Sequence, residues 1–161
     1  MATVVADRDP SIPHNFRHNR RDPNTEDLSG IFFGPDMTTI GSIMTRNVLT
    51  LDHTKTAHDA AVFMKEKKIG SVIIIAYGKP FGIVTERDLA RTISFLTLPP
   101  KCLILSFLAS RPLICASPSQ TIQEASEIME SYNIDHLVVV EKDEIVGMVT
   151  TRDLAMYLLV Q

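Results

Sequence analysis

Two uninterrupted runs of apolar residues stand out in the hydrophobic pattern of the chain. Residues 71–76 read Ser-Val-Ile-Ile-Ile-Ala, and residues 136–140 read His-Leu-Val-Val-Val. Neither run alternates between apolar and polar positions, as a strand with one face in water would. Both are rich in β-branched residues, which favour extended backbone. The pattern therefore predicts two central strands that are covered on both faces.

A helical pattern precedes each central strand. Thr56 with Asp59, and Thr121 with Glu124, have the residue types and spacing of a capping box, which marks the start of a helix. Apolar residues then recur near helical spacing at Ala57, Ala60, Ala61 and Met64, and again at Ile122, Ala125, Ile128 and Met129. We expect two equivalent helices.

Short apolar runs and a second helical pattern follow each central strand. The strands are bounded by turn-forming residues, and each helix begins next to an Arg-Asp pair. The predicted order in each half is therefore β-α-β-β-α. We expect the remaining strands at 48–51, 81–84 and 145–149, and the second helices at 88–96 and 153–159.

These elements belong to a unit that the chain contains twice. Residues 82–90 read Gly-Ile-Val-Thr-Glu-Arg-Asp-Leu-Ala and return at 147–155 as Gly-Met-Val-Thr-Thr-Arg-Asp-Leu-Ala, a constant offset of 65 positions. A fixed offset marks a structural repeat. Because one copy alone would bury little surface, we expect the two to pack as one pseudo-two-fold domain. The predicted fold class is α/β (α+β), with two β-α-β-β-α repeats.

The predicted organisation has four segments. Scattered prolines and polar residues at 1–36 predict a flexible N-terminal tail. The first repeat is assigned to 38–96 and the second to 105–161. Residues 97–104 form the linker, because its two adjacent prolines cannot continue the preceding helix.

Composition limits the classes of partner. The 161 residues carry 16 Lys plus Arg and 19 Asp plus Glu, a formal net charge of −3, so no overall basic field attracts nucleic acid or an anionic membrane. Arg17, Arg20 and Arg21 leave a nucleic-acid role for the tail open, but its mixed charges favour a solvated segment. No apolar run approaches the roughly 20 residues of a membrane helix. Asp7 and Asp9 do not fit a targeting peptide, so we expect a cytoplasmic protein.

The sequence contains no pattern typical of catalysis. Cys102 and Cys115 lack CxxC spacing, and the five histidines are scattered along the chain. No P-loop and no nucleophile paired with a base is present. We expect no enzyme activity, no metal site and no catalytic cofactor.

The doubled Thr-x-x-Asp pattern has two interpretations. Thr85 with Asp88, and Thr150 with Asp153, fit a helix cap, since an acid in the first turn is favoured by the helix dipole. The same carboxylate could instead accept two vicinal hydroxyl groups, with the Thr hydroxyl, free N–H groups and a neighbouring Arg holding phosphate or ribose oxygens. Ribose with a phosphate meets that description. The apolar stretches that could take a flat base lie around Ile40, Ile43, Val48 with Thr50, and Leu113.

The doubled Gly-h-h-Thr-x-Arg-Asp-Leu unit, where h is an apolar residue, resembles a pair of cystathionine β-synthase type (CBS) domains, called a Bateman module. The segments that precede this unit, at 69–75 and 134–140, also resemble those of CBS domains. The resemblance covers about residues 38–160. It implies a stand-alone CBS-domain protein whose inter-repeat cleft binds AMP, ADP, ATP or S-adenosylmethionine. Members of this family act mostly as regulators.

The resemblance also implies roles for single residues. The ribose acids would be Asp88 and Asp153, with Thr85 and Thr150 contacting phosphate or sugar. In some members a basic residue at the start of the central strand reaches phosphate at the partner repeat's site, and His136 occupies that position. An ordinary half-buried histidine is the alternative. By the offset its counterpart is Ser71, so the site at Asp88 is expected to hold phosphate better than the site at Asp153.

Arg87 and Arg152 precede the two acids and are candidates for phosphate contact, the alternative being solvated ion pairs. The leading hypothesis is a non-catalytic adenine-nucleotide sensor that signals to a partner protein. The runner-up is an assembly module with vestigial sites. The second helices carry more apolar residues than one core face needs, so both hypotheses predict a homodimer through these helices.

Overall fold

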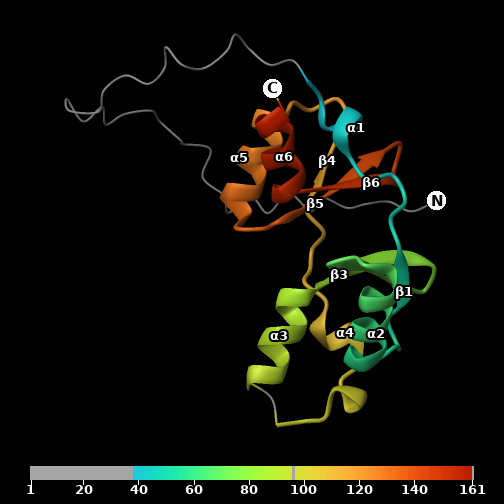
Figure 1. The fold of residues 1–161 in the computed structure, drawn as a ribbon. Helices are drawn as coiled ribbons and strands as arrows, with labels where there is room; N and C mark the ends of the chain where they lie inside the picture. The colour runs from blue at the N-terminus through green and yellow to red at the C-terminus, as the bar shows by residue number, and fades with distance from the viewer. Residues whose placement is uncertain (1–37, 96, 161) are drawn as a thin grey trace.

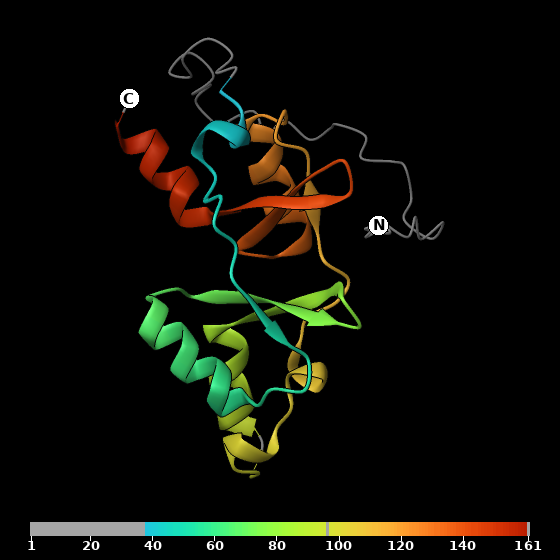
Figure 2. The same ribbon diagram turned by 90° about the vertical axis from the view of Figure 1, so that its right-hand side faces the viewer.

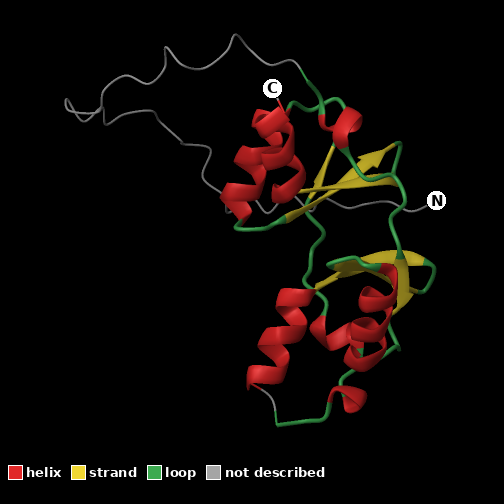
Figure 3. Ribbon diagram, viewed as in Figure 1, coloured by secondary structure: helices red, strands yellow, loops and turns green. Residues whose placement is uncertain are grey.

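The computed structural model describes residues 38–95 and 97–160, and the predicted tail at 1–36 lies outside them. Figure 1 shows two lobes stacked one on the other, each built around a three-stranded sheet. Coloured by secondary structure, the two lobes look alike (Figure 3). The elements of the first lobe are β1 (Thr50–Asp52), α2 (Ala57–Lys67), β2 (Ser71–Ala76), β3 (Lys79–Thr85) and α3 (Glu86–Phe95). Those of the second are β4 (Cys115–Ala116), α5 (Ile122–Tyr132), β5 (His136–Glu141), β6 (Glu144–Thr150) and α6 (Thr151–Val160).

The two sheets have the same topology. In each, the central strand pairs in parallel with the first strand and antiparallel with the third. The register places Ser71 opposite Thr85 and His136 opposite Thr150. The predicted α+β class and the β-α-β-β-α order are therefore confirmed. Each repeat also carries a short helix that the pattern did not predict, α1 (Ile40–Ile43) and α4 (Leu105–Leu108).

The short helices are exchanged between the lobes. Ile40 of α1 and the following Met44 belong to the hydrophobic core of the second lobe, and Leu105 of α4 belongs to that of the first. Backbone hydrogen bonds also join Thr45, which follows α1, to Met148 of β6, and Ser110, which follows α4, to Ile83 of β3. Each lobe is thus completed by the segment that begins the other repeat, which ties the two lobes together.

Both faces of each central strand are covered, as predicted. Val72 and Ile74 point into the first lobe's core, where helices α2 and α3 pack. Ile73 lies on the opposite face of the strand and is also fully buried. Its counterpart Val138 is 1% exposed. Figure 2 shows the two sheets facing each other, so these side chains are buried between the lobes.

The predicted capping boxes start α2 and α5. The Thr56 hydroxyl accepts the Asp59 N–H at 3.2 Å while the Asp59 carboxylate accepts the Thr56 N–H at 2.9 Å. Thr121 and Glu124 make the same pair of bonds at 3.2 and 2.7 Å. None of the helices in the described part of the chain has the length and apolar character needed to cross a membrane.

Candidate functional site

The Thr-x-x-Asp pairs sit where the third strand of each sheet runs into the following helix. The Asp88 carboxylate accepts the Thr85 N–H at 2.8 Å and the Thr85 hydroxyl at 2.7 Å through one oxygen, Oδ2. Thr150 and Asp153 repeat both bonds at the same distances. Both Thr-x-x-Asp pairs therefore form helix caps, at the starts of α3 and α6. In each carboxylate Oδ1 accepts no hydrogen bond from the described residues, so an oxygen is left that can bind a ligand hydroxyl.

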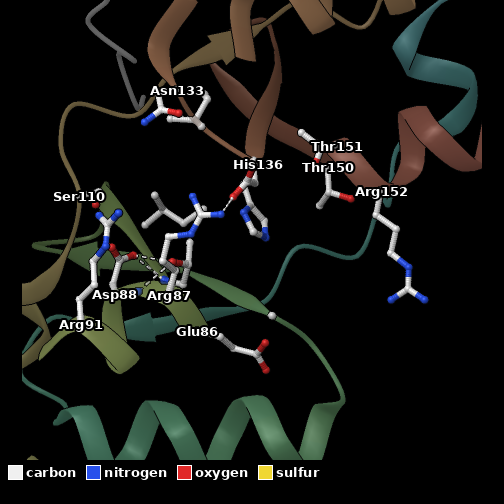
Figure 4. A pocket seen from close by; sticks show the side chains of 15 residues that line it. Glu86, Arg87, Asp88, Arg91, Ser110, Asn133, His136, Thr150, Thr151 and Arg152 are labelled. Carbon is white, nitrogen blue, oxygen red and sulfur yellow. Dashed lines mark hydrogen bonds and ion pairs between the residues drawn. The ribbon is translucent and has the colours of Figure 1, made fainter. Parts of the chain in front are cut away.

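A cleft of about 620 Å³ lies beside Asp88, between the two lobes. Its walls come from both repeats: the start of α3, the loop before β5, and the start of α6 (Figure 4). We call it the Asp88 cleft. Its lining includes six residues proposed from the sequence, namely Thr85, Arg87, Asp88, His136, Thr150 and Arg152. The pseudo-symmetry and the exchanged segments bring them together, although up to 67 positions separate them in the chain.

The cleft also contains residues that were not proposed from the sequence. Arg91 lies one helical turn beyond Arg87 and Asp88, and this spacing could have shown that it shares their face of α3. Ser110 lies just after α4 in the exchanged segment, and no local sequence pattern indicated that it would line the cleft. Ile83 and Ile134 add apolar walls.

An ion pair spans the cleft. Arg87 Nη2 of the first repeat lies 2.5 Å from Asp135 Oδ2 of the second, and both side chains are about half exposed. Asp135 was not proposed as a site residue. The offset of 65 pairs it with Gly70, so a comparison of the two repeats could have singled it out. Arg152, the counterpart of Arg87, makes no ion pair with a described residue, and its side chain extends away from the Arg87–Asp88 group (Figure 4).

His136 lies at the junction of the two repeats. Burial lowers the pKa of this imidazole below its ordinary value of 6.5, and Arg87 acts in the same direction. The carboxylates of Asp135, Asp88 and Asp153 oppose the shift without cancelling it. The lowered pKa favours the neutral imidazole, and an anion arriving beside it would favour its protonation.

The pseudo-two-fold counterpart of the Asp88 cleft is a smaller slot of about 140 Å³, which we call the Thr150 slot. Six of its lining residues correspond, at the 65-residue offset, to residues of the Asp88 cleft: Thr45, Ile69, Gly70, Ser71, Met148 and Thr150. Met148 stands where the larger cleft has Ile83, and its sulfur accepts the Ser71 hydroxyl at 3.3 Å. The acid Asp153 is half-buried and is not among the residues that line the slot.

The apolar residues proposed for the base fall in different places. Ile40 is fully buried in the second lobe's core, and Ile43 packs against that core, so the structure does not bring them to either site. Val48 lines the Thr150 slot. Val48 and Thr50 also line a separate cleft beside the turn between β5 and β6. Leu113 is half-buried and lines neither the Asp88 cleft nor the Thr150 slot.

Comparison with known proteins identifies the family. The model of the CBS domain matches residues 40–94 and 105–160, so the chain belongs to the CBS-domain family and contains two such repeats. It is 32% identical over 117 residues to an uncharacterized protein of Methanopyrus kandleri, covering 71% of this chain and 60% of that protein. It is 28% identical over 119 residues to the CBS domain-containing protein YhcV of Bacillus subtilis, covering 74% of this chain and 84% of YhcV.

The fold is similar to that of solved CBS-domain proteins. A putative signal-transduction protein with CBS domains from Burkholderia ambifaria superposes with a TM-score of 0.73 at 25% identity, over 77% of this chain and 96% of that one. CBS pairs are in general regulatory, ligand-binding modules, and the chain carries such a pair.

Proposed function

We propose that this protein is a non-catalytic regulatory module that binds an adenine nucleotide in the Asp88 cleft and signals its presence to a partner protein. The observation that carries the proposal is the Asp88 carboxylate, half-buried in the wall of an inter-repeat cleft. One of its oxygens is held in the helix cap, and the other accepts no hydrogen bond from residues 38–95 or 97–160. The cleft volume of about 620 Å³ falls within the range usual for small-molecule sites.

Each part of the nucleotide has a matching group in the cleft. The free Asp88 oxygen would accept ribose hydroxyl groups, and Ile83 and Ile134 would flank the base. Arg87, Arg91 and, after protonation, His136 would hold phosphate. A ligand with contacts to both repeats would favour one arrangement of the lobes over others, which is how binding could be read by a partner.

Calorimetric titration with AMP, ADP, ATP and S-adenosylmethionine tests the proposal. We expect at least one of these ligands to bind with saturable heat, and the Asp88→Ala variant to bind it at least tenfold more weakly, since a hydrogen bond to a charged group is worth roughly 1.5 to 3 kcal/mol. Absence of binding by all four ligands would exclude the adenine-nucleotide function.

A second candidate function is assembly of two copies with the sites vestigial. It is favoured by an exposed apolar surface on α6, formed by Met156, Leu158, Leu159 and Val160, which are 53 to 80% exposed. Side chains of this kind on one helix fit a helix-to-helix contact with a second copy. Light scattering after gel filtration should give a dimer mass, and Leu158→Glu should shift it to a monomer. A dimer that binds no adenine ligand would favour this function.

A further inference from the structure

The Arg87–Asp135 ion pair occupies the part of the Asp88 cleft where a phosphate would bind. Arg87 precedes the proposed ribose acid Asp88, and Asp135 precedes His136. All four residues line the same cleft. The ion pair joins a cation of the first repeat to an anion of the second across this cleft. The guanidinium that an anionic ligand would seek is thus already held by a carboxylate.

The first repeat supplies no such carboxylate to Arg152 at the equivalent position. Gly70 stands at the position of Asp135, and Arg152 at that of Arg87 makes no ion pair with a described residue. The main-chain setting is otherwise the same. The Asp135 carbonyl accepts the Thr151 N–H at 3.1 Å, as the Gly70 carbonyl accepts the Glu86 N–H at 2.9 Å. The Asp135 side chain is therefore not needed to hold this loop in place.

We propose that Asp135 sets the selectivity of the Asp88 cleft for phosphorylated over unphosphorylated ligands, because an anionic ligand must compete with the Asp135 carboxylate for the Arg87 guanidinium. The proposal rests on the proposed function and deepens it. A phosphate that binds Arg87 replaces an ion pair between the repeats with one between protein and ligand. An uncharged ligand such as adenosine can use Asp88 and the apolar walls while the pair stays closed.

The size of the effect follows from the exposure of the pair. Its side chains are 55% and 42% exposed, and ion pairs in that setting shift an equilibrium by at most about fivefold. Removing the Asp135 charge also removes its repulsion of the phosphate. This adds a small further gain in phosphate affinity, because the high dielectric near the protein surface weakens the repulsion. We expect neutralisation of Asp135 to strengthen AMP binding about three- to tenfold and to leave adenosine binding within about twofold.

The test is calorimetric titration of AMP and adenosine into wild type, Asp135→Asn and Glu144→Gln. Asp135→Asn keeps the shape of the side chain and the main-chain bond to Thr151. Glu144→Gln makes the same change in net charge on an exposed residue outside the Asp88 cleft, and it should leave both affinities within about twofold. A rise in the ratio of AMP to adenosine affinity in Asp135→Asn alone would support the proposal. An unchanged ratio, or an equal rise in Glu144→Gln, would overturn it.

The same variants separate this proposal from the proposed function. If wild type binds neither AMP nor adenosine, the adenine function fails, and inorganic tripolyphosphate becomes the probe, since it needs Arg87 but no ribose acid. Tighter tripolyphosphate binding by Asp135→Asn than by wild type and Glu144→Gln would then support the part played by Asp135. Equal binding by all three proteins, or none by any, would overturn it.

Discussion

The Asp88 cleft and the Thr150 slot are built from corresponding residues of two repeats and nevertheless differ in size and charge. Their helix starts are alike, with the same Thr and Asp and the same capping distances. Their volumes are about 620 and 140 Å³. An intact Thr-x-x-Asp motif is therefore not always accompanied by a large cleft.

The difference comes from the residues around the motif. His136 and Asp135 of the larger cleft correspond to Ser71 and Gly70, and Ile83 corresponds to Met148. His136 lines both cavities, so the exchange that removes a charge is that of Asp135 for Gly70, and Met148 places a longer, flexible side chain in the slot. The repeats thus keep one local structure while offering one charged cleft and one narrow, mainly apolar slot.

The largest expected effect separates the two acids. Asp88→Ala should weaken binding of the preferred adenine nucleotide at least tenfold, whereas Asp153→Ala should change it by less than about threefold, because only Asp88 lines the large cleft. Both variants lose the same helix cap, worth about 0.5 to 2 kcal/mol, so their thermal unfolding midpoints should fall equally. Calorimetry measures the first quantity and circular dichroism the second. Equal losses of affinity would mean that both sites bind nucleotide.

Alanine substitution at the equivalent glycines, Gly82 and Gly147, should destabilise the protein to different extents, because different kinds of atom from the exchanged segments lie against them. A Cβ on Gly82 would lie 2.8 Å from the Ser110 carbonyl oxygen, and one on Gly147 would lie 2.5 Å from the Met44 sulfur. Main chain cannot move as a Met side chain can, so Gly82→Ala should lower the free energy of unfolding by about 1 to 3 kcal/mol and Gly147→Ala by clearly less. Urea denaturation of both variants checks this order. A greater loss for Gly147→Ala would contradict it.

The His136 position should matter for phosphate but not for the sugar or base. His136→Ala is expected to weaken AMP about fivefold, the value of a net hydrogen bond, and adenosine by less than about twofold. Ser71→Ala, the matched change in the first repeat, should leave both affinities within about twofold. Titration of the two ligands into each variant measures the four values. Parallel losses of AMP and adenosine in His136→Ala would remove the phosphate role.

The smallest expected effect is a pH dependence of stability without ligand. Burial lowers the pKa of His136, so the unfolded chain binds a proton more readily than the folded one below pH 6.5. The stability contributed by the neutral imidazole is therefore present above pH 6.5 and is lost as the pH falls through the lowered pKa. Thermal unfolding at pH 7.5 and 5.5 should show a smaller decrease for His136→Gln than for wild type. Identical decreases would show that His136 does not contribute.

The local parts of this fold followed from the sequence. The 65-residue offset, the apolar runs and the pairs Thr56 with Asp59 and Thr121 with Glu124 predicted the repeats, the central strands and two helix starts. These features depend on side-chain periodicity and on hydrogen bonds between residues three positions apart, which a single sequence displays directly. The acids at the two later helix starts were found for the same reason.

Only the tertiary structure decided which segments complete each lobe and which acid lies in an open cleft. Ile40 and Ile43 were proposed for the base because they are apolar and begin a repeat, yet α1 crosses to the other lobe and buries them in its core or against it. The Arg87–Asp135 pair joins residues 48 positions apart. Cleft volume likewise depends on how side chains of two sheets fill the space between them, which close packing determines and no local pattern records.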